Sequence, residues 1–492
     1  MQDDLTTQKK VYIETYGCQM NVADTEVVLS VLHNAGYTPT ANIAEATIAF
    51  MNTCAIRENA EEKVWNRLNH WKSLKKKRPE MVVGVLGCMA EHLRKDLLQN
   101  SENVVDLVIG PDEYRKLPQL IESTLGSGEK GISVQLSRTE TYSDILPFRA
   151  DGISAYISVM RGCDKFCTFC VVPFTRGRER SRELASIVDE CKTLEQQGFR
   201  EITLLGQNVN SYEDLGFDFS DLLAACAKAV PHLRIRYTTS HPQDFDQKLV
   251  DTMASHDNIC KYIHLPFQSG SDRILKLMNR TYTRAHYMSI IEMVKRAMPE
   301  VALSTDVIVG FCTETLEDHE MTKRVMEEVG YEGAYMFNYS PRPNTRAYDT
   351  LEDDVPLAEK TRRLQELIVI QREIAGIKNQ VQLGTRQTVL VEGRSKKDAD
   401  QWKGRTDTNW TVVFPRMDAE VGEYRLVEII SANAATLIGR LTDVHRAEHT
   451  TPEHGLDRGD VLYDLTPLVI SNIEPKEHIG IAQPAAMFPI LS

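Results

Sequence analysis

The sequence predicts a multidomain α/β protein with an open parallel α/β domain, an incomplete (β/α) barrel and a small all-β barrel. Three observations support this fold class. Short apolar runs alternate with amphipathic helical patterns over the first ~145 residues, six further strand-and-helix repeats follow, and after Gly384 hydrophobic and polar residues alternate. A chain of 492 residues is long enough for two to four domains.

Residues 1–145 are expected to form the open parallel domain, because short apolar runs there precede amphipathic segments such as 25–35. These runs have the length and composition of buried strands. They span residues 11–16, 47–52 and 81–86. The glycine-rich segment 126–131 predicts a flexible break, and the residues from there to Asp151 are typical of a linker.

Residues 146–376 are expected to form a partial barrel and a linking helix. Strand-like runs alternate with helical patterns six times, whereas a complete (β/α) barrel normally needs eight repeats. The runs span residues 153–160, 201–206, 234–239, 260–265, 301–309 and 334–339. Pro356 opens a long helix, with Asp353 or Asp354 as its expected N-cap. Its expected apolar stripe consists of Leu364, Leu367, Ile368, Ile374 and Ile377.

After Gly384 the alternating pattern predicts the strands of a small closed β-barrel. The expected strands span residues 388–392, 410–414, 423–430 and 435–441. We therefore assign residues 377–445 to a small β-barrel domain of the OB-like type. Residues 446–492 show little periodicity and are expected to form an extended tail.

Composition limits the class of protein. The net charge of −13 argues against a nucleic-acid binder that depends on bulk positive charge, but leaves room for local basic surfaces. No stretch approaches ~18 consecutive apolar residues, and the acidic start of the chain has no signal-peptide core. We therefore expect a cytoplasmic protein without a membrane span. Its ten cysteines should be reduced thiols that are buried or bind metal.

Three cysteines stand close together in Cys163-Asp-Lys-Phe-Cys167-Thr-Phe-Cys170, just after the first expected strand of the partial barrel. A four-iron cluster normally takes four thiolates. This spacing supplies three, so one iron would keep an open coordination site, where a metal does chemistry. A zinc site or buried thiols are the alternatives, but zinc sites more often carry two pairs of cysteines. We therefore favour an iron–sulfur cluster.

A second set of three cysteines, Cys18, Cys54 and Cys88, is spread through the N-terminal domain. Each follows an expected strand and precedes a helical pattern, so all three would lie on the carboxyl edge of the sheet, where ligands bind. Helix N-termini at that edge favour anionic thiolates. Glycines before Cys18 and Cys88 would let the backbone approach a bulky group. Three unrelated buried cysteines would not repeat this order, so we predict a second cluster.

The remaining four cysteines carry weaker signals. Cys191 and Cys226 fall on apolar helix faces and Cys260 falls within an expected strand, so burial is expected for all three. Cys312 follows a strand end, from which it could approach the open edge of the partial barrel. Burial is still the favoured interpretation for it.

The spacing of Cys163, Cys167 and Cys170 resembles the radical S-adenosylmethionine (SAM) superfamily, and six barrel strands agree with that resemblance. It implies a [4Fe–4S] cluster whose open iron binds SAM and whose electron releases a 5′-deoxyadenosyl radical. It also implies that Phe169 lies against the adenine. Further cofactor contacts are expected where barrel strands end, at Gly206, Gln207 and Ser240. Other polar candidates there, as often helix caps as ligands, are Asn208, Thr239, His241, His264, Gln268, Ser269, Asp306, Asn338 and Arg342.

Two three-cysteine sets in one chain resemble the methylthiotransferase family of that superfamily, and the similarity covers everything before the tail. The sequences Thr15-Tyr-Gly-Cys18-Gln-Met-Asn21 and Ser269-Gly-Ser-Asp272 resemble the branch that makes 2-methylthio-N6-dimethylallyladenosine in tRNA. The resemblance implies two [4Fe–4S] clusters, one of them auxiliary, with SAM as radical source and methyl donor. The implied reaction adds a methylthio group to C2 of N6-isopentenyladenosine at position 37, next to the anticodon.

Three other functions stay open at this level. A related methylthiotransferase acts on N6-threonylcarbamoyladenosine in tRNA, and another acts on an aspartate of a ribosomal protein. The residues around Cys18 disfavour both, the first less decisively, and the β-barrel lacks the strong acidity expected for the second. An iron–sulfur protein that only binds RNA or senses redox state would need neither an open iron nor six barrel strands.

The implied partners are SAM, the tRNA anticodon stem-loop and an electron donor such as flavodoxin or ferredoxin, and the chain is expected to act as a monomer. The β-barrel segment 377–442 has ten Lys/Arg against eight Asp/Glu, a slightly basic balance. Trp402 and Trp410 would offer RNA stacking faces there unless they pack in the core. Another basic footing for RNA is expected at Arg176, Arg178, Arg180 and Arg182.

Overall fold

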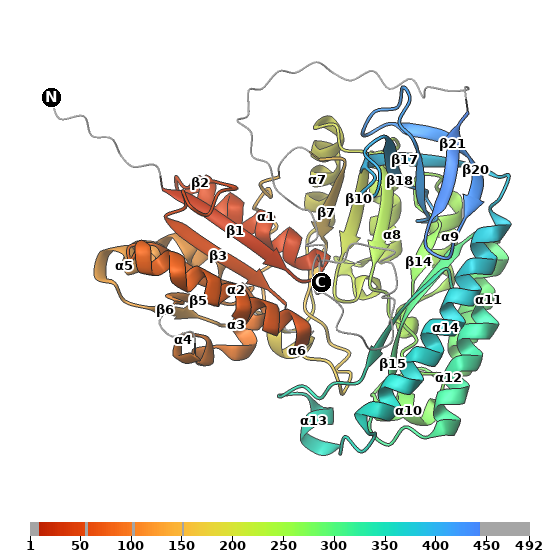
Figure 1. The fold of residues 1–492 in the computed structure, drawn as a ribbon, viewed down its shortest axis with the longest axis horizontal. Helices are drawn as coiled ribbons and strands as arrows, with labels where there is room; N and C mark the ends of the chain where they lie inside the picture. Colours follow the sequence, from red (N-terminus) through yellow and green to blue (C-terminus); the bar gives the residue numbers. More distant parts are fainter. Residues whose placement is uncertain (1–8, 55–57, 101–103, 150–151, 443–492) are drawn as a thin grey trace.

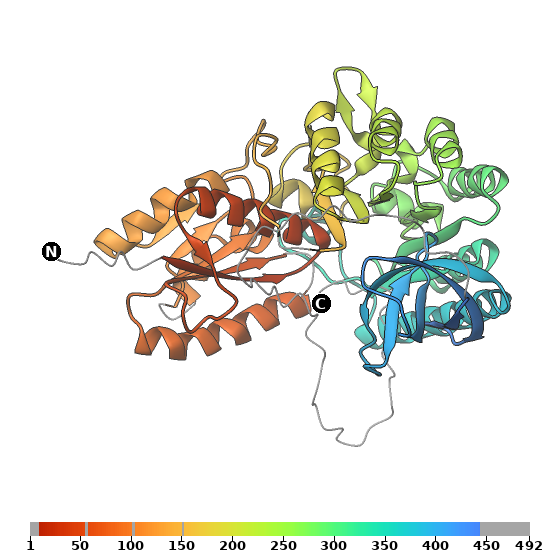
Figure 2. The same cartoon turned by 90° about the horizontal axis from the view of Figure 1, so that it is seen from above.

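The computed structural model describes residues 9–54, 58–100, 104–149 and 152–442, so the expected tail at 446–492 lies outside the described residues. The chain folds into an N-terminal α/β domain, a central partial barrel and a small closed β-barrel (Figure 1). Viewed from above, the N-terminal domain lies on one side of the molecule and both barrels lie on the other (Figure 2). The predicted fold class is confirmed.

The N-terminal domain is built on one parallel sheet with the strand order β2-β1-β3-β4-β5-β6. Strands β3 and β4 are buried on both faces, which explains their nearly continuous apolar sequences. A hydrophobic core lies on each side of the sheet. The strands are β1 (Lys10–Tyr16), β2 (Thr38–Pro39), β3 (Ile48–Thr53), β4 (Val82–Gly87), β5 (Leu107–Ile109) and β6 (Gly131–Ser133). The helices are α1 (Gln19–Asn34), α2 (Glu58–Lys77), α3 (Cys88–Leu93), α4 (Lys95–Asn100) and α5 (Leu117–Ser127).

The expected flexible break at 126–131 is wrong. Helix α5 ends at Ser127 and is capped by Gly128, whose φ of 71° is the left-handed conformation that commonly terminates a helix. The chain then adds β6 to the edge of the sheet beside β5. Tyr142, within the expected linker, is buried in the N-terminal core and donates to the carbonyl of Pro111 at 3.0 Å. The glycines therefore shape a turn inside the domain.

The central domain contains six parallel strands in two groups of three, β13-β10-β7 and β14-β15-β16. A bridge between Ile235 and Ile259 connects the groups, and one hydrophobic core runs beneath all six strands, as expected for a partial barrel. The strands are β7 (Ser154–Ser158), β10 (Glu201–Leu205), β13 (Arg234–Thr238), β14 (Tyr262–His264), β15 (Ala302–Val309) and β16 (Gly333–Asn338). The longer helices are α7 (Leu184–Gln196), α8 (Phe219–Ala229), α9 (Gln247–Ser255), α11 (Arg284–Ala297), α12 (Leu316–Val329) and α14 (Leu357–Val381). Shorter elements are β8 (Met160–Arg161), α6 (Val172–Thr175), β9 (Arg180–Ser181), β11 (Glu213–Asp214), β12 (Phe217–Asp218), α10 (Asp272–Leu277) and α13 (Arg346–Thr350).

Helix α14 packs beside the last barrel strand, β16, and beside α12 (Figure 1). Its N-cap is Pro356, so the expected caps Asp353 and Asp354 are wrong. Asp353 instead accepts from Lys360 Nζ at 2.6 Å, and Asp354 accepts from the Thr313 amide at 2.7 Å. Asp353 therefore binds the first turn of α14 itself, and Asp354 connects the approach to the helix with the segment around Thr313.

The buried face of α14 differs from the expected apolar stripe. Leu367 is fully buried, but Ile377 is 68% exposed. Polar residues take part in the buried face because the surface beneath offers them partners. Arg363 pairs with Glu314 at 2.7 Å, and Gln371 donates to a backbone carbonyl at 2.9 Å.

The small barrel closes in the order β17-β18-β19-β21-β20. Alternation predicts four of these strands but not β18, in which Trp402 is the only large hydrophobic residue. Trp402 and Trp410 are 7% and 6% exposed and pack in the barrel core, so of the two alternatives for them core packing is confirmed and RNA stacking is excluded. The strands are β17 (Arg386–Arg394), β18 (Gln401–Arg405), β19 (Thr411–Pro415), β20 (Tyr424–Ala432) and β21 (Leu437–Leu441).

Buried charges join the small barrel to the amino ends of β10 and β13. Glu201, which begins β10, pairs with Arg236 at 2.7 Å and with Arg405 of the small barrel at 3.3 Å. Arg234, which begins β13, donates to the carbonyls of Arg405 and Thr388 at 2.8 Å each. The small barrel therefore lies at the end of the strands opposite their carboxyl ends.

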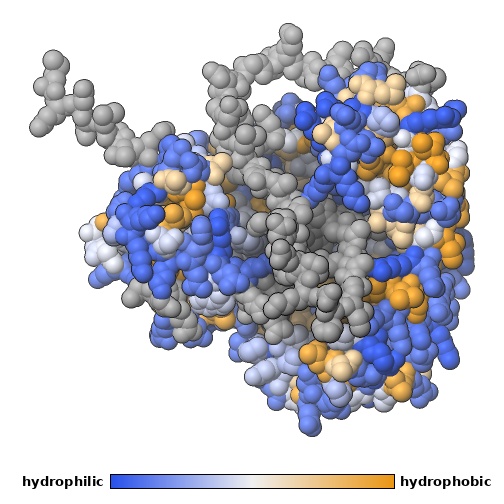
Figure 3. Space-filling model, viewed as in Figure 1, coloured by the Kyte–Doolittle hydropathy of each residue, from blue (hydrophilic) through white to orange (hydrophobic). Residues whose placement is uncertain are grey.

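Polar residues cover most of the face drawn in Figure 3, and hydrophobic residues occur in scattered groups, with more of them over the barrels than over the N-terminal domain. Among the described residues, no helix combines the length and the hydrophobicity that crossing a lipid bilayer requires.

The core position of Trp402 predicts a stability effect. Replacing Trp402 with alanine removes a buried indole whose Nε1 donates to the Ala419 carbonyl at 2.7 Å, and should destabilise the small barrel by about 3–5 kcal/mol. Native-state hydrogen exchange of amides in β17–β21 measures the loss. Arg416→Ala is the matched control, because the Arg416 guanidinium lies 4.4 Å from the centroid of the same ring but is not part of the barrel core. Equal protection in the tryptophan variant would contradict a core role.

Candidate functional site

The carboxyl edge of the N-terminal sheet brings Cys18, Cys54 and Cys88 together. They follow β1, β3 and β4, which are adjacent parallel strands in the sheet. Cys18 is the N-cap of α1, and Cys88 is the first residue of α3. The hydrogen-bonding Cys54 thiol and the charge of Arg176 lower the pKa of Cys18 to about 6, against the effect of burial. This clustering supports the predicted ligand set, whose metal binding stays a prediction.

Two asparagines, Asn21 and Asn52, hold the cysteine loops together. The side-chain oxygen of Asn21 accepts from the Cys18 amide at 3.3 Å, and its Nδ2 donates to the Thr53 carbonyl at 3.2 Å. Asn52 Nδ2 donates to the Asn21 carbonyl at 2.8 Å. Both asparagines are fully buried, where an unpaired amide would be costly. Asn21 ends the sequence motif around Cys18, whereas the only signal in the sequence for Asn52 is its place two residues before Cys54.

The glycines that precede two of these cysteines make room for a neighbouring loop. A Cβ added at Gly17 would lie 2.6 Å from Cys54 Cβ, and one at Gly87 would lie 2.4 Å from Asn52 Oδ1. Both glycines have positive φ, at 142° and 86°. The expected close backbone approach is therefore present, but it is an approach to the next cysteine loop.

A buried cluster of charges connects this edge to the central domain. Arg176, which follows α6, donates from Nε to the Cys88 sulfur at 3.1 Å and from Nη2 to Asp24 at 2.8 Å. Arg161 binds the same carboxylate at 2.8 Å. Arg176 Nη1 is buried and has no hydrogen-bond partner among the described residues. Two arginines facing one aspartate leave a positive charge beside the thiols, which favours an anionic ligand.

The expected RNA footing is wrong for three of its four arginines. Arg176, Arg180 and Arg182 are 3%, 6% and 5% exposed. Arg180 and Arg182 pair with buried carboxylates at 2.9 and 2.7 Å. Arg178 is exposed and pairs with Asp164 at the surface, at 2.6 Å.

The loop that carries Cys163, Cys167 and Cys170 begins at the carboxyl end of the barrel strands. The expected strand at 153–160 is interrupted, because β7 ends and β8 then pairs antiparallel with β9 on the far side of the loop. The Cys163 amide donates to the Gly177 carbonyl at 3.1 Å, and the Cys170 amide donates to the Cys167 carbonyl at 3.0 Å. These bonds hold the three thiols on one tight loop.

Two side chains position this loop from outside. Gln207, an expected cofactor contact, accepts from the Gly162 amide at 2.6 Å. Arg280 donates to the Cys167 sulfur at 3.3 Å and to the Pro266 carbonyl at 3.1 Å. Each three-cysteine set therefore has one arginine that donates to one of its sulfur atoms.

Several strand-end candidates present polar atoms that the protein leaves unpaired. Asn208 Oδ1, Ser240 Oγ and Gln268 Oε1 are buried and lack a hydrogen-bond partner within the described part of the chain. Buried polar atoms are normally paired, so these three suit a polar ligand. At Gly206, which follows β10, the backbone packs closely against Met160, since an added Cβ would lie 2.6 Å from Met160 Cγ. This edge fits SAM, which carries several polar groups.

Other strand-end candidates have local roles. His241 Nδ1 accepts from the Gln243 amide at 3.2 Å, so it caps a short turn. Burial, with the charges of Arg280 and Lys165, lowers the pKa of His241 to about 2, so its ring is neutral. His264 lies 2.8 Å from Ser304 Oγ, a separate contact within β14 and β15.

Phe169 packs against Phe311, with ring centroids 6.5 Å apart, in a small core that also contains Cys312. Phe169 lies within the cysteine loop and is half-buried, and its contact with the adenine stays a prediction. The expected burial of the four other cysteines is confirmed, since Cys191, Cys226 and Cys312 are fully buried and Cys260 is 3% exposed. Cys260 precedes β14, so its expected place within a strand is wrong.

No three His, Cys, Asp or Glu side chains among the described residues lie close enough to enclose a single metal ion. A [4Fe–4S] cluster has no such requirement, because its thiolates bind different iron atoms. Three thiols on one loop, an arginine donor and a neighbouring edge of unpaired polar atoms fit a cluster with SAM. Three thiols beside a surplus positive charge fit a second cluster.

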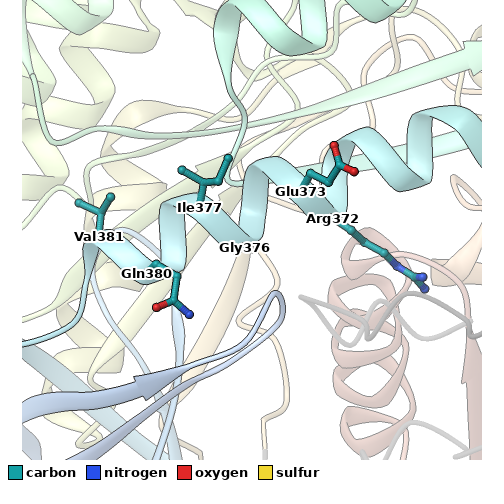
Figure 4. Close-up of a pocket in the computed structure, with 6 residues that line it drawn as sticks. All are labelled: Arg372, Glu373, Gly376, Ile377, Gln380 and Val381. Carbon is teal, nitrogen blue, oxygen red and sulfur yellow. The ribbon is translucent and has the colours of Figure 1, made fainter.

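The hollow in Figure 4 is a separate feature. Its lining comes from one helix and includes none of the cysteines or strand-end candidates. A cofactor site needs polar groups that converge from several elements, which one helix face does not provide. The lining residues are Arg372, Glu373, Gly376, Ile377, Gln380 and Val381.

Comparison with protein-family models agrees with this geometry. The uncharacterized protein family UPF0004 matches residues 10–110, the radical SAM superfamily matches residues 157–326 and the TRAM domain matches residues 380–442. A solved radical SAM methyltransferase, TsrM from Kitasatospora setae, shares the fold with a TM-score of 0.53 and 15% identity, over 70% of this chain and 77% of that one. The chain is thus a radical SAM protein with a TRAM domain.

Curated relatives narrow this class. A tRNA-2-methylthio-N(6)-dimethylallyladenosine synthase of Chloroherpeton thalassium is 51% identical over 87% of this chain and 95% of its own. Those of Bacteroides thetaiotaomicron and Amoebophilus asiaticus are also 51% identical, over 88% and 89% of this chain and 96% and 93% of theirs. This protein belongs to the family of tRNA-2-methylthio-N(6)-dimethylallyladenosine synthases.

The close contact at Gly87 predicts a loss of iron. In Gly87→Ala the new methyl group would overlap Asn52 and the Thr53 carbonyl, so Cys54 and Cys88 would separate. After anaerobic reconstitution the variant should hold about four irons, compared with about eight in the unchanged protein. Gly36→Ala is the matched control, because its φ is also 86° but nothing lies within 4 Å of the added Cβ. Full iron content in Gly87→Ala would show that the edge tolerates the displacement.

Proposed function

We propose that this protein adds a methylthio group to C2 of N6-isopentenyladenosine at position 37 of tRNA, beside the anticodon. The observation that carries the proposal is the family membership, joined to two three-cysteine sets at strand ends. The relatives' names favour this function over methylthiolation of N6-threonylcarbamoyladenosine or of a ribosomal-protein aspartate. They also favour it over a non-catalytic iron–sulfur protein that binds RNA or senses redox state.

In the central domain, Cys163, Cys167 and Cys170 would hold one [4Fe–4S] cluster. When bound, that cluster supplies the electron that cleaves SAM to a 5′-deoxyadenosyl radical, able to act on an aromatic C–H that acid–base chemistry leaves inert. Ser240 and Gln268 offer their unpaired oxygens to SAM, while Gly206 and Phe169 shape the edge around it. Gln207 holds the cysteine loop in place.

At the N-terminal sheet, Cys18, Cys54 and Cys88 would hold the auxiliary [4Fe–4S] cluster and handle the transferred sulfur. The surplus positive charge of Arg161 and Arg176 over Asp24 favours an anionic sulfur species at this edge. Asn21 and Asn52 would keep the three thiolates in register.

The remaining features of the proposal concern partners and location. The cleavage of SAM needs a one-electron reductant, for which a flavodoxin or ferredoxin is suited. The protein would act as a monomer in the cytoplasm, because one chain carries both cysteine sets and the substrate is tRNA. The small barrel would bind the tRNA away from the reacting base, because it docks at the opposite end of the barrel strands.

A triple variant separates the roles of the two cysteine sets. With Cys18, Cys54 and Cys88 replaced by alanine, reductive cleavage of SAM should continue, since the radical loop lies in another domain. Methylthio transfer to isopentenylated tRNA should be lost. Mass spectrometry of 5′-deoxyadenosine and of the modified nucleoside in one reaction measures both. Cys226→Ala, which removes a fully buried thiol outside both sets, should keep both products.

Methylthio product from the triple variant would rule out the sulfur-handling role. Loss of both products, with iron still bound in the radical loop, would mean that SAM cleavage depends on the auxiliary set.

Two neighbouring lysines on the small barrel allow a test of RNA binding. Lys396 and Lys397 are exposed in the turn between β17 and β18. Replacing both with glutamine should weaken tRNA binding and reduce the slope of log K against log salt by about 0.7 per lost phosphate contact. Lys76 and Lys77, an exposed pair at the end of α2, provide the matched control. If the slope of log K against log salt is equal for the two variants, the small barrel does not take part in RNA binding.

A further inference from the structure

Two exposed phenylalanines and an arginine form a surface beside the radical loop, here called the aromatic shelf. Phe166 and Phe174 are 41% and 45% exposed, and their rings meet edge to face with centroids 6.5 Å apart. The guanidinium of Arg178 lies 5.5 Å from the Phe166 ring. Arg178 itself is 66% exposed at its side chain. The three residues thus present two aromatic rings and a cation to solvent.

Folding does not explain why Phe166 occupies its position. Its φ of 46° lies in the left-handed region, which is unfavourable for a residue with a Cβ. A large apolar side chain usually offsets such strain by burial, but the Phe166 ring stays exposed. Strained residues of this kind concentrate at functional sites.

Contacts with neighbouring residues restrain the backbone and the arginine of the aromatic shelf. Asn279 Nδ2 donates to the Phe166 carbonyl at 3.0 Å and so supports the left-handed turn. A Cβ added at Gly162 would lie 2.0 Å from the Arg178 carbonyl, so these two backbone segments are in direct contact. Arg178 also pairs with Asp164 at 2.6 Å. A preformed shelf loses little entropy when a flat ligand stacks on it.

The position of the shelf links both three-cysteine sets. Phe166 directly precedes Cys167 in the radical loop. Phe174 lies on α6, which packs against α3, and Val171 just before α6 contacts Cys88. A group that stacks on the shelf would therefore lie at the junction where the substrate base must meet both sets.

We propose that the aromatic shelf stacks one of the two bases that flank the isopentenyladenosine of the tRNA. Exposed aromatic rings with a neighbouring arginine are the usual platform for unpaired bases. The stacked neighbour holds the loop open and presents the target base to the two sets. This inference rests on the proposed function and specifies how the protein binds the tRNA beside the target base.

The test compares shape-matched variants of the reconstituted, full-length enzyme. Phe174→Leu keeps an apolar side chain but removes the ring, and should raise the Kd for an isopentenylated anticodon stem-loop by roughly 5- to 100-fold. Phe174→Tyr keeps the ring and should bind within about twofold of the unchanged enzyme. Phe217→Leu, a change at an exposed phenylalanine on β12, serves as the control and should also stay within twofold. Fluorescence anisotropy measures each Kd.

A double-mutant cycle identifies the stacked base. Stem-loops with an abasic nucleotide on either side of the isopentenyladenosine are bound to the unchanged enzyme and to Phe174→Leu. The abasic loop that lacks the stacked base should lose affinity for the unchanged enzyme but little more for the variant, because the two changes remove the same contact.

The outcomes separate the shelf from the proposed function. Methylthio product from the unchanged enzyme, with equal Kd values for Phe174→Leu and Phe174→Tyr, would overturn the shelf alone. Additive losses with both abasic loops would overturn it too, and would mean that the shelf is covered by something other than a flanking base. Absence of methylthio product from the unchanged, fully reconstituted enzyme would overturn the proposed function.

Discussion

The carboxylate of Asp24 is buried between the N-terminal and central domains, where Arg161 and Arg176 both donate to it. Arg161 precedes the radical loop and Arg176 follows it, so one carboxylate holds both ends of that loop. Asp24 lies on α1, the helix that Cys18 caps. Removal of one partner from a buried ion pair costs about 3–5 kcal/mol, so this contact is strongly maintained. Because it joins α1 to both ends of the radical loop, it fixes the spacing between the two cysteine sets.

Arginines also contact the thiols of both cysteine sets. Arg176 donates to Cys88 and Arg280 donates to Cys167, and both arginines are otherwise held by oxygen atoms. Hydrogen bonds to the sulfur ligands stabilise the more negative state of an iron–sulfur cluster. Arg280 and the cysteine that it contacts, Cys167, belong to the same domain. Arg176 belongs to the central domain, whereas Cys88, which it contacts, belongs to the N-terminal domain. The docking of the two domains therefore completes the surroundings of the N-terminal set.

Local patterns in the sequence were sufficient for the architecture and for the core of the site. Strand–cysteine–helix order placed Cys18, Cys54 and Cys88 on one sheet edge, because parallel strands end at the same side. The spacing of Cys163, Cys167 and Cys170 needed no tertiary information, since the three share one loop. Six apolar runs likewise predicted the partial barrel, and alternation predicted the small one. Each of these signals lies within a short stretch of consecutive residues, so it does not depend on contacts with remote segments.

The tertiary structure alone decided what the charged and aromatic side chains do. Arg176 resembles an RNA contact in the sequence, yet its partner Asp24 lies 152 residues away and draws it into the domain interface. Trp402 resembles a stacking face until closure of the small barrel buries it. The strand β6 and the buried face of α14 depend on surfaces that other segments supply. Periodicity describes a residue's own element, whereas burial and pairing are set by remote segments that local sequence does not specify.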